Sequence, residues 1–434
     1  MNIYSQKQNY GINVERNYEI VKFLISSHLN IDLWPKPYSK NFNYQINGTI
    51  KSLSDLGYED LQEVIEQLNA IIDIRHLSDL EKIILARSAC AALTISWDFK
   101  ECSPKKRKYG PALVVSHPIT VAAMLGTTDF LVILAALSHD TIEDSPQHKI
   151  LIKYYKGKEL TKEEIDLVGL TDSDLNPKRS ERKKVYDKLL IEFIDTYIKN
   201  LGIMEEKKKE ILRFYLNALT HRGYVGYNKY IIRMLCSASK KLNINDFSGY
   251  YLILIKGYDK WDNTNSKPKY GTAEEIKKAR FNICKDAFKL LLIIQTIDYF
   301  LFRFNRRMKI VLSKSSEKVK EKWLGMDTVE LSSLYGKLCG IGIKNLEEIL
   351  NLLEIPNDEG IDESELKNYI EYRINRYKDS SPKFLILDIN KLLKEKHTNL
   401  LLDILKLRSL ALYFLDEFRK FKSLDENRVC KLII

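Results

Sequence analysis

The stretch SHPITVAAMLGTTDFLVILAALSHDTIEDSP, residues 116–146, joins a long apolar run to a sudden cluster of histidine and acidic side chains. Its unbroken apolar part, residues 130–137, predicts a helix that buries this run in a core. Thr128 stands where it can cap the start of the helix, and Pro146 prevents its continuation because proline lacks a backbone N–H. The stretch therefore predicts a buried helix whose C-terminal end is polar.

The polar end of this helix places His139 four residues before Glu143 and Asp140 four residues before Asp144. Residues four apart are neighbours on one helix face, and buried acids are costly unless they are paired or bind a metal. An isolated His-Asp pair is more often part of an ordinary core. Here a second histidine, His117, precedes the pair by 22 residues, ahead of an apolar stretch that can form a facing helix. Two neighbouring helices can thus offer three ligands to a divalent metal.

An octahedral metal site needs a further acid, and the segment YYLILIKGYDKWDNTNS, residues 250–266, offers candidates at the end of another apolar run. Its charged side chains are Lys256, Asp259, Lys260 and Asp262, and Asn263 directly follows Asp262. Spacing alone leaves Asp259 as one candidate among 58 acidic residues.

The order of these residues resembles the H…HD…D signature of the HD superfamily of metal-dependent phosphohydrolases. His117, the pair His139-Asp140 and the later Asp259 occupy its four places. The resemblance implies that these four side chains hold one divalent metal ion, Mn²⁺. Such a cation would lower the pKa of water and neutralise charge on phosphate oxygens.

Within that superfamily, the similarity is greater to the hydrolase domain of the RelA/SpoT homologues, which remove the 3′-pyrophosphate from the alarmone (p)ppGpp. The pair Glu143-Asp144 matches the ED pair of that group, and residues 107–111, RKYGP, resemble its RKxGxP-like loop. Residues 256–263, KGYDKWDN, resemble its KLADxxxN-like motif, and residues 218–234 resemble its ALT…YxxY segment. The resemblance covers about residues 80–266, less than half of the chain.

The resemblance also implies roles for further residues. Glu143 and Asp144 would be catalytic, as a pair of acids that orients water and moves its proton. The implied nucleotide contacts are Arg107, Lys108, Tyr227, Lys256 and Asn263.

Helical periodicity dominates the chain and predicts an all-α protein, with an HD-type helical core and helical N- and C-terminal extensions. We expect an N-terminal extension over 1–75, a metal phosphohydrolase domain over 76–289 and a C-terminal helical region over 290–434. Residues 149–210 carry 15 basic and 13 acidic side chains, which indicates a solvated helical insertion within the middle domain.

The formal net charge of +11 favours a polyanionic partner. The excess is local: residues 97–110 carry +3, residues 226–286 carry +6 and residues 303–322 carry +6. The first two segments bracket the predicted metal site and suit a nucleotide. The third could face nucleic acid, although a charge run on a long helix is more often a solvated face.

The longest apolar run has eight residues, against the roughly 18 needed to cross a bilayer, so we expect no membrane span. The first residues, MNIYSQKQNYG, show no secretory signal, and the six cysteines contain no CxxC spacing. These features predict a cytoplasmic protein with reduced thiols, and they leave its oligomeric state open.

The leading functional prediction is Mn²⁺-dependent hydrolysis of (p)ppGpp that releases its 3′-pyrophosphate. One alternative keeps the site but changes the substrate to another nucleotide, such as (p)ppApp, a dNTP or NADPH. A second alternative is a non-catalytic nucleotide sensor whose basic C-terminal half binds a partner. The presence of Glu143 and Asp144 favours the enzyme, since a sensor has no need of them.

Overall fold

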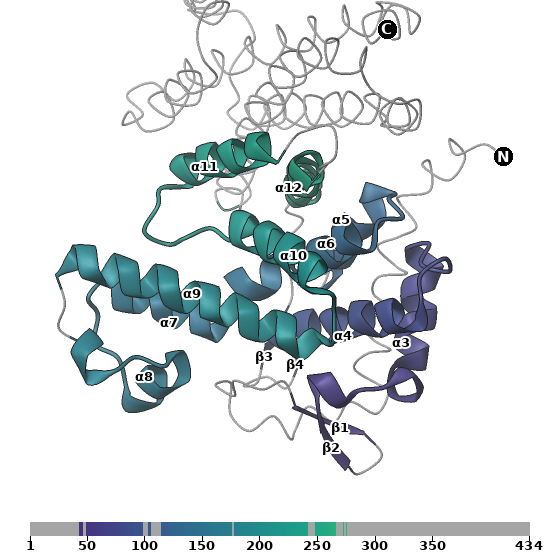
Figure 1. Ribbon diagram of the computed structural model, residues 1–434, viewed down its shortest axis with the longest axis horizontal. Helices are drawn as coiled ribbons and strands as arrows, with labels where there is room; N and C mark the ends of the chain where they lie inside the picture. The colour runs from purple at the N-terminus through teal and green to yellow at the C-terminus, as the bar shows by residue number, and fades with distance from the viewer. Residues whose placement is uncertain are drawn as a thin grey trace, which may run out of the picture. The chain divides into compact units, whose positions relative to one another are not determined.

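The computed structural model describes residues 43–46, 49–98, 103–105, 114–175, 178–241 and 248–265, together with Thr272 and Glu275. This part of the chain is predominantly helical, which confirms the predicted all-α class (Figure 1). The predicted contact residues Arg107 and Lys108, and the basic segment 303–322, lie outside the described residues.

Element labels follow Figure 1. The α-helices are α3 (Tyr58–Ile71), α4 (Asp79–Ile95), α5 (Ser116–Leu125), α6 (Phe130–Glu143), α7 (Pro146–Tyr155), α8 (Lys162–Val168), α9 (Arg179–Leu201), α10 (Glu206–Leu219), α11 (Tyr227–Lys240) and α12 (Ser248–Asn265). Two short 3₁₀ helices are η3 (Leu53–Asp55) and η4 (Asp172–Asp174). Two antiparallel strand pairs join β1 (Asn43–Ile46) to β2 (Thr49–Ser52), with Asn43 opposite Ser52, and β3 (Trp97–Asp98) to β4 (Ser103–Pro104).

The chain forms two compact units, Met1–Tyr230 and Ile231–Ile434. The first unit contains α3 to α10, and the second contains α12 and most of α11. The domain limits predicted near residues 76 and 290 stay predictions.

Helix α6 is the centre of the first unit, where it packs against α4, α5 and α10. Residues 132–139 are each at most 2% exposed, so the helix is buried on every side over this length. Its N-cap is Asp129 rather than the predicted Thr128: one carboxylate oxygen of Asp129 accepts from the backbone N–H groups of Leu131 and Val132, at 2.9 and 3.2 Å. A carboxylate suits this position because it also interacts with the positive end of the helix dipole.

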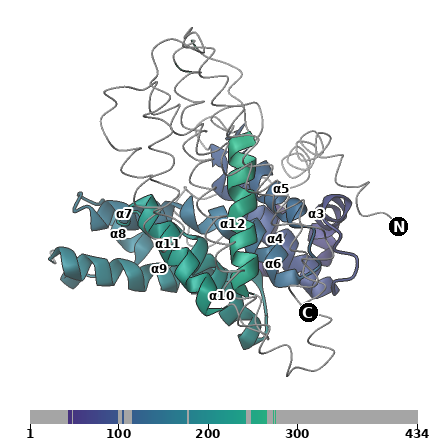
Figure 2. The ribbon, with the colours of Figure 1, turned by 90° about the horizontal axis from the view of Figure 1, so that it is seen from above.

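The described part of the charged segment 149–210 is mostly helical, and its longest helix, α9, contributes to the core. Apolar side chains recur every three or four residues of α9 and are buried: Tyr186, Leu190, Ile194, Tyr197 and Leu201. This face packs against α7 and α10 and reaches α4. In both views of the first unit, α7 to α9 lie on one side and α3 on the other, with α4 to α6 between them (Figures 1 and 2).

Arg87 of α4 joins the end of α9 to the segment before α3. Its buried guanidinium donates to the carbonyl of Leu201 at 2.9 Å, to that of Leu56 at 3.0 and 2.7 Å, and to that of Ser54 at 2.6 Å. Gly202 allows this approach, because its φ is +137° and a Cβ there would lie 2.8 Å from the nearest Arg87 nitrogen. Arg87 thereby fixes the C-terminal end of α9 against α4.

Among the helices that the structure describes, none has the length and apolar character needed to cross a membrane.

Candidate metal centre

Helices α5 and α6 form a hairpin that brings two histidines together. His117 is the second residue of α5, and Pro118 follows in the first turn, where its missing N–H breaks no helical hydrogen bond. Helix α5 ends at Gly126, whose φ of +59° reverses the chain toward α6. Because the chain returns antiparallel, the start of α5 lies beside the end of α6.

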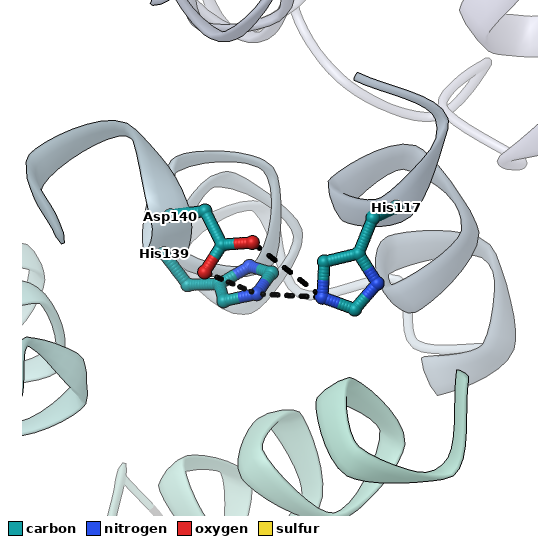
Figure 3. Close-up of side chains that lie close together, drawn as sticks. All are labelled: His117, His139 and Asp140. Atoms are coloured by element: carbon teal, nitrogen blue, oxygen red, sulfur yellow. Dashed lines mark hydrogen bonds and ion pairs between the residues drawn. The ribbon is translucent and has the colours of Figure 1, made fainter. Parts of the chain in front are cut away.

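Three side chains converge at that point, as Figure 3 shows. The Nε2 atoms of His117 and His139 are 3.3 Å apart. Asp140 places Oδ1 at 3.2 Å from Nε2 of His139 and Oδ2 at 3.5 Å from Nε2 of His117. Both histidines are buried, whereas the Asp140 side chain is 33% exposed. The cluster is thus buried on its histidine side and open to solvent at its carboxylate.

The spacing of these atoms suits a single cation. Metal–nitrogen and metal–oxygen bonds of about 2.1 Å place adjacent ligand atoms about 3.0 to 3.4 Å apart in octahedral or tetrahedral geometry. The Nε2–Nε2 separation of 3.3 Å falls in this range, and each of the two nitrogens has a different Asp140 oxygen at a similar distance, 3.2 Å from His139 and 3.5 Å from His117. In the part of the chain that the structure describes, this is the one group of three or more His, Cys, Asp or Glu side chains able to hold a metal ion. Two imidazoles and a carboxylate suit manganese, iron or zinc.

The backbone sets the tautomer of His139. Its Nδ1 lies 2.7 Å from the carbonyl oxygen of Ala136, which can only accept, so Nδ1 carries the proton. In the neutral ring, Nε2 then directs its lone pair toward His117 and Asp140. Histidines that bind metals commonly donate their second ring N–H to such a carbonyl.

Glu143, predicted to be catalytic, lies at the end of α6, and its carboxylate is directed toward the α10–α11 connection. One oxygen accepts a hydrogen bond of 3.1 Å from the backbone N–H of His221. The ring of His221 in turn donates from Nε2 to the carbonyl of Val225 at 2.7 Å. Glu143 therefore links the helix that carries two of the candidate ligands to a connection that contains a further histidine.

Asp144, the second predicted catalytic acid, caps the C-terminus of α6, and its backbone N–H donates to the Asp140 carbonyl at 2.8 Å. Its side chain is 49% exposed, with Nζ of Lys149 at 3.8 Å. Partial burial and the nearby Asp140 carboxylate raise the pKa of Asp144, and Lys149 and Lys105 oppose that increase.

Asp259, the predicted fourth ligand, lies on α12 in the second unit, so its predicted role stays a prediction. Within α12 the structure brings together three of the predicted residues. Oδ2 of Asp259 lies 2.6 Å from Nζ of Lys256, and its Oδ1 accepts from Nδ2 of Asn263 at 2.6 Å. Lys256 and Asp259 are both buried, so each charge compensates the other.

The remaining predicted substrate contacts stay predictions. Tyr227 is the first residue of α11, but its side chain lies outside the described residues, as do Arg107 and Lys108.

Sequence reasoning missed His148, which is 1% exposed on α7. Its Nδ1 donates to the carbonyl of Glu143 at 2.9 Å, and its Nε2 accepts from the hydroxyl of Tyr186 at 2.7 Å. Burial lowers the pKa of His148 to about 4, since the charged form loses its hydration. The signal in the sequence was a third histidine soon after the His-Asp pair, inside a helix begun by Ser145-Pro146.

Comparisons with known proteins return no match for this chain, whether among family models, curated proteins or solved structures. The interpretation of the site therefore depends on its geometry and on the order of the sequence motifs.

Proposed function

We propose that this protein is a metal-dependent phosphohydrolase that removes the 3′-pyrophosphate from a guanosine alarmone, (p)ppGpp. The observation that carries the proposal is the convergence of His117, His139 and Asp140 within one helical hairpin. These residues supply the first three ligands of the H…HD…D pattern. The proposed cation is Mn²⁺, with Asp259 as the fourth ligand on the basis of sequence resemblance.

The reaction is the hydrolysis of one phosphate ester bond. A water oxygen forms a bond to the phosphorus attached to the 3′ oxygen, and the bond between that phosphorus and the 3′ oxygen breaks. The electron pair stays on the 3′ oxygen, which takes up a proton, and pyrophosphate leaves. When bound, a divalent cation supplies Lewis acidity that lowers the pKa of water and neutralises phosphate charge.

In this proposal the end of α6 supplies the proton-transfer groups. Glu143 and Asp144 follow the candidate ligand Asp140 by three and four residues, which is about one helical turn. One of the two acids would orient the water and accept its proton, and the 3′ oxygen would receive a proton in return. Lys105 and Lys149, whose charges act on Asp144, would attract the phosphates.

One observation favours the alternative of a non-catalytic nucleotide sensor. The Glu143 carboxylate already accepts a hydrogen bond from the His221 N–H, an arrangement that also suits a purely structural acid. The sensor would retain the metal and the nucleotide but not the turnover. A hydrolase for a different nucleotide would use the same groups, since the metal ligands and the acid pair would act on phosphate and water rather than on the base.

The test is a hydrolysis assay on the full chain with Mn²⁺. Separate reactions contain (p)ppGpp, (p)ppApp, dNTPs or NADPH, and release of phosphate or pyrophosphate is measured beside an Asp140→Ala control. The proposal predicts pyrophosphate release from (p)ppGpp that the control lacks. Turnover of another nucleotide alone would contradict the alarmone assignment, and binding without any turnover would support the sensor.

A further inference from the structure

Three buried hydroxyl groups, each from a different helix, meet at Ser138, the residue that precedes His139 on α6. The Oγ atoms of Ser88 on α4 and Ser138 on α6 are 2.8 Å apart. The hydroxyl of Tyr197 on α9 donates to Ser138 Oγ at 3.0 Å and lies 3.2 Å from Ser88 Oγ. All three side chains are at most 1% exposed. We call these three residues the hydroxyl triangle.

Stability alone does not require the hydroxyl triangle. Burying a hydroxyl is costly, and the hydrogen bonds within the triangle mainly offset that cost. An apolar set of similar shape would be about as stable. Hydrogen bonds differ from apolar packing in being directional, so they restrict rotation and sliding of the helices that they join.

The restricted helix is the one that presents two candidate ligands. Ser138 directly precedes His139 and Asp140. Its hydroxyl contacts α4 and α9, whereas His139 and Asp140 face His117 on α5. Side-chain atoms lie about 5 to 6 Å from a helix axis, so a rotation of about 10° would displace the ligand atoms by about 1 Å. Metal ligands tolerate displacements of only about 0.2 Å.

Tyr197 is itself held firmly in the core. Burial raises the pKa of Tyr197, so its hydroxyl keeps its proton and remains a donor. Leu201, one turn further along α9, accepts a hydrogen bond from Arg87, the residue before Ser88 on α4. Two adjacent residues of α4 therefore hold two successive turns of α9, and Tyr197 extends that connection to α6.

We propose that Tyr197 is a positioning residue for the metal centre: through Ser138, it sets the rotation of α6 at which His139 and Asp140 meet His117. The inference depends on the proposed metal site. It also gives the charged segment 149–210 a function, because α9 supplies the hydroxyl.

The experiment compares Tyr197→Phe with wild type in the full chain. The probes are Mn²⁺, for the dissociation constant, and Co²⁺, whose visible absorption reports ligand geometry. The melting temperature of the metal-free protein is measured in parallel. Tyr154→Phe is the matched control, because the buried Tyr154 loses a hydroxyl bond to the Asp174 carbonyl that does not involve α6.

We expect Tyr197→Phe to weaken Mn²⁺ binding by about threefold to tenfold and to alter the Co²⁺ spectrum. The metal-free melting temperature should change no more than in Tyr154→Phe. Ser88→Ala leaves the bond between Tyr197 and Ser138 in place, so its effect on binding should be smaller. Ser138→Ala removes the acceptor of the Tyr197 hydroxyl, so it should weaken Mn²⁺ binding and provides a second test if Tyr197→Phe does not fold.

Unchanged Mn²⁺ affinity and Co²⁺ spectrum in Tyr197→Phe, beside metal binding by wild type, would overturn the positioning role alone. The same conclusion follows if Tyr197→Phe lowers only the melting temperature. If it does not fold, a Ser138→Ala protein that folds and binds both metals as wild type does would overturn the role as well. Absence of metal binding by wild type would overturn the proposed function and this inference together.

Discussion

The carboxylate of Glu143 accepts a hydrogen bond of 3.1 Å from the backbone N–H of His221, which lies 78 residues further along the chain. The bond joins the end of α6 to the α10–α11 connection. It gives Glu143 a structural contact as well as its proposed catalytic role, and the two roles can be separated by mutation.

The substitution Glu143→Gln separates them, because the amide oxygen of glutamine can still accept from His221 but cannot act as a base. We expect hydrolysis to fall about 10²- to 10⁴-fold while Mn²⁺ affinity and melting temperature stay close to wild type. Steady-state turnover and a metal titration measure the two effects. Turnover at the wild-type rate in Glu143→Gln would show that this acid is structural only.

Substitution of Arg87, which is not part of the candidate metal centre, should greatly reduce the stability of the fold. Arg87→Met keeps most of the stem but removes the donors to the buried carbonyls of Leu56 and Leu201. Buried acceptors that lose their partners typically cost about 1 to 3 kcal/mol each, so we expect a loss of about 3 kcal/mol in the free energy of unfolding. Denaturant titration measures it.

The matched control for that substitution is Arg75→Met. Arg75 also pairs with a neighbour, Asp73, but both side chains are largely exposed to solvent. We expect its denaturation midpoint to match wild type, because exposed ion pairs contribute little. Equal effects of the two substitutions would contradict the structural role of Arg87.

Because the pKa of the buried His148 is lowered, we expect the stability of the protein to depend on pH. Its pKa is about 4 in the folded protein against an ordinary value of 6.5, so the unfolded chain binds a proton more readily. The stabilisation from neutral His148 is therefore fully present above pH 6.5 and is lost as the pH falls toward 4. The pKa difference corresponds to about 3 kcal/mol.

The variant His148→Asn keeps a donor for the Glu143 carbonyl but does not titrate. It should be less stable than wild type at pH 7.5, because the Tyr186 hydroxyl loses its acceptor. It should lose less stability between pH 7 and pH 4.5, as followed by denaturant midpoints in the presence of a chelator. Parallel pH profiles of the two proteins would show that His148 does not cause the dependence.

The sequence was sufficient to predict the helical class and the buried helix with a polar end, because an apolar run followed by His-Asp has a clear pattern. It was not sufficient to predict the 3.3 Å between the two histidines, which depends on how the α5–α6 hairpin turns at Gly126. The cap was misplaced by one residue because Thr128 and Asp129 are both good cap residues, and their backbone conformations decide between them.

The charged segment 149–210 shows a second limit of prediction from sequence. Its balance of charges predicted a solvated insertion, and its helices are present in the structure. The buried face of α9 was encoded by residues such as Tyr186, Leu190 and Tyr197, which recur at helical spacing among the charges. Net charge averages over both faces of a helix, so it could not reveal this face or the contact of Tyr197 with Ser138.

The proposed metal centre is tested most directly by the number of Mn²⁺ ions that the protein binds. Metal-free full-length chain is titrated with Mn²⁺ by calorimetry, beside His139→Ala and the exposed-histidine control His76→Ala. The proposed metal centre predicts one equivalent bound by wild type and by His76→Ala, and none by His139→Ala. Binding that persists unchanged in His139→Ala, or no binding by wild type, would contradict it.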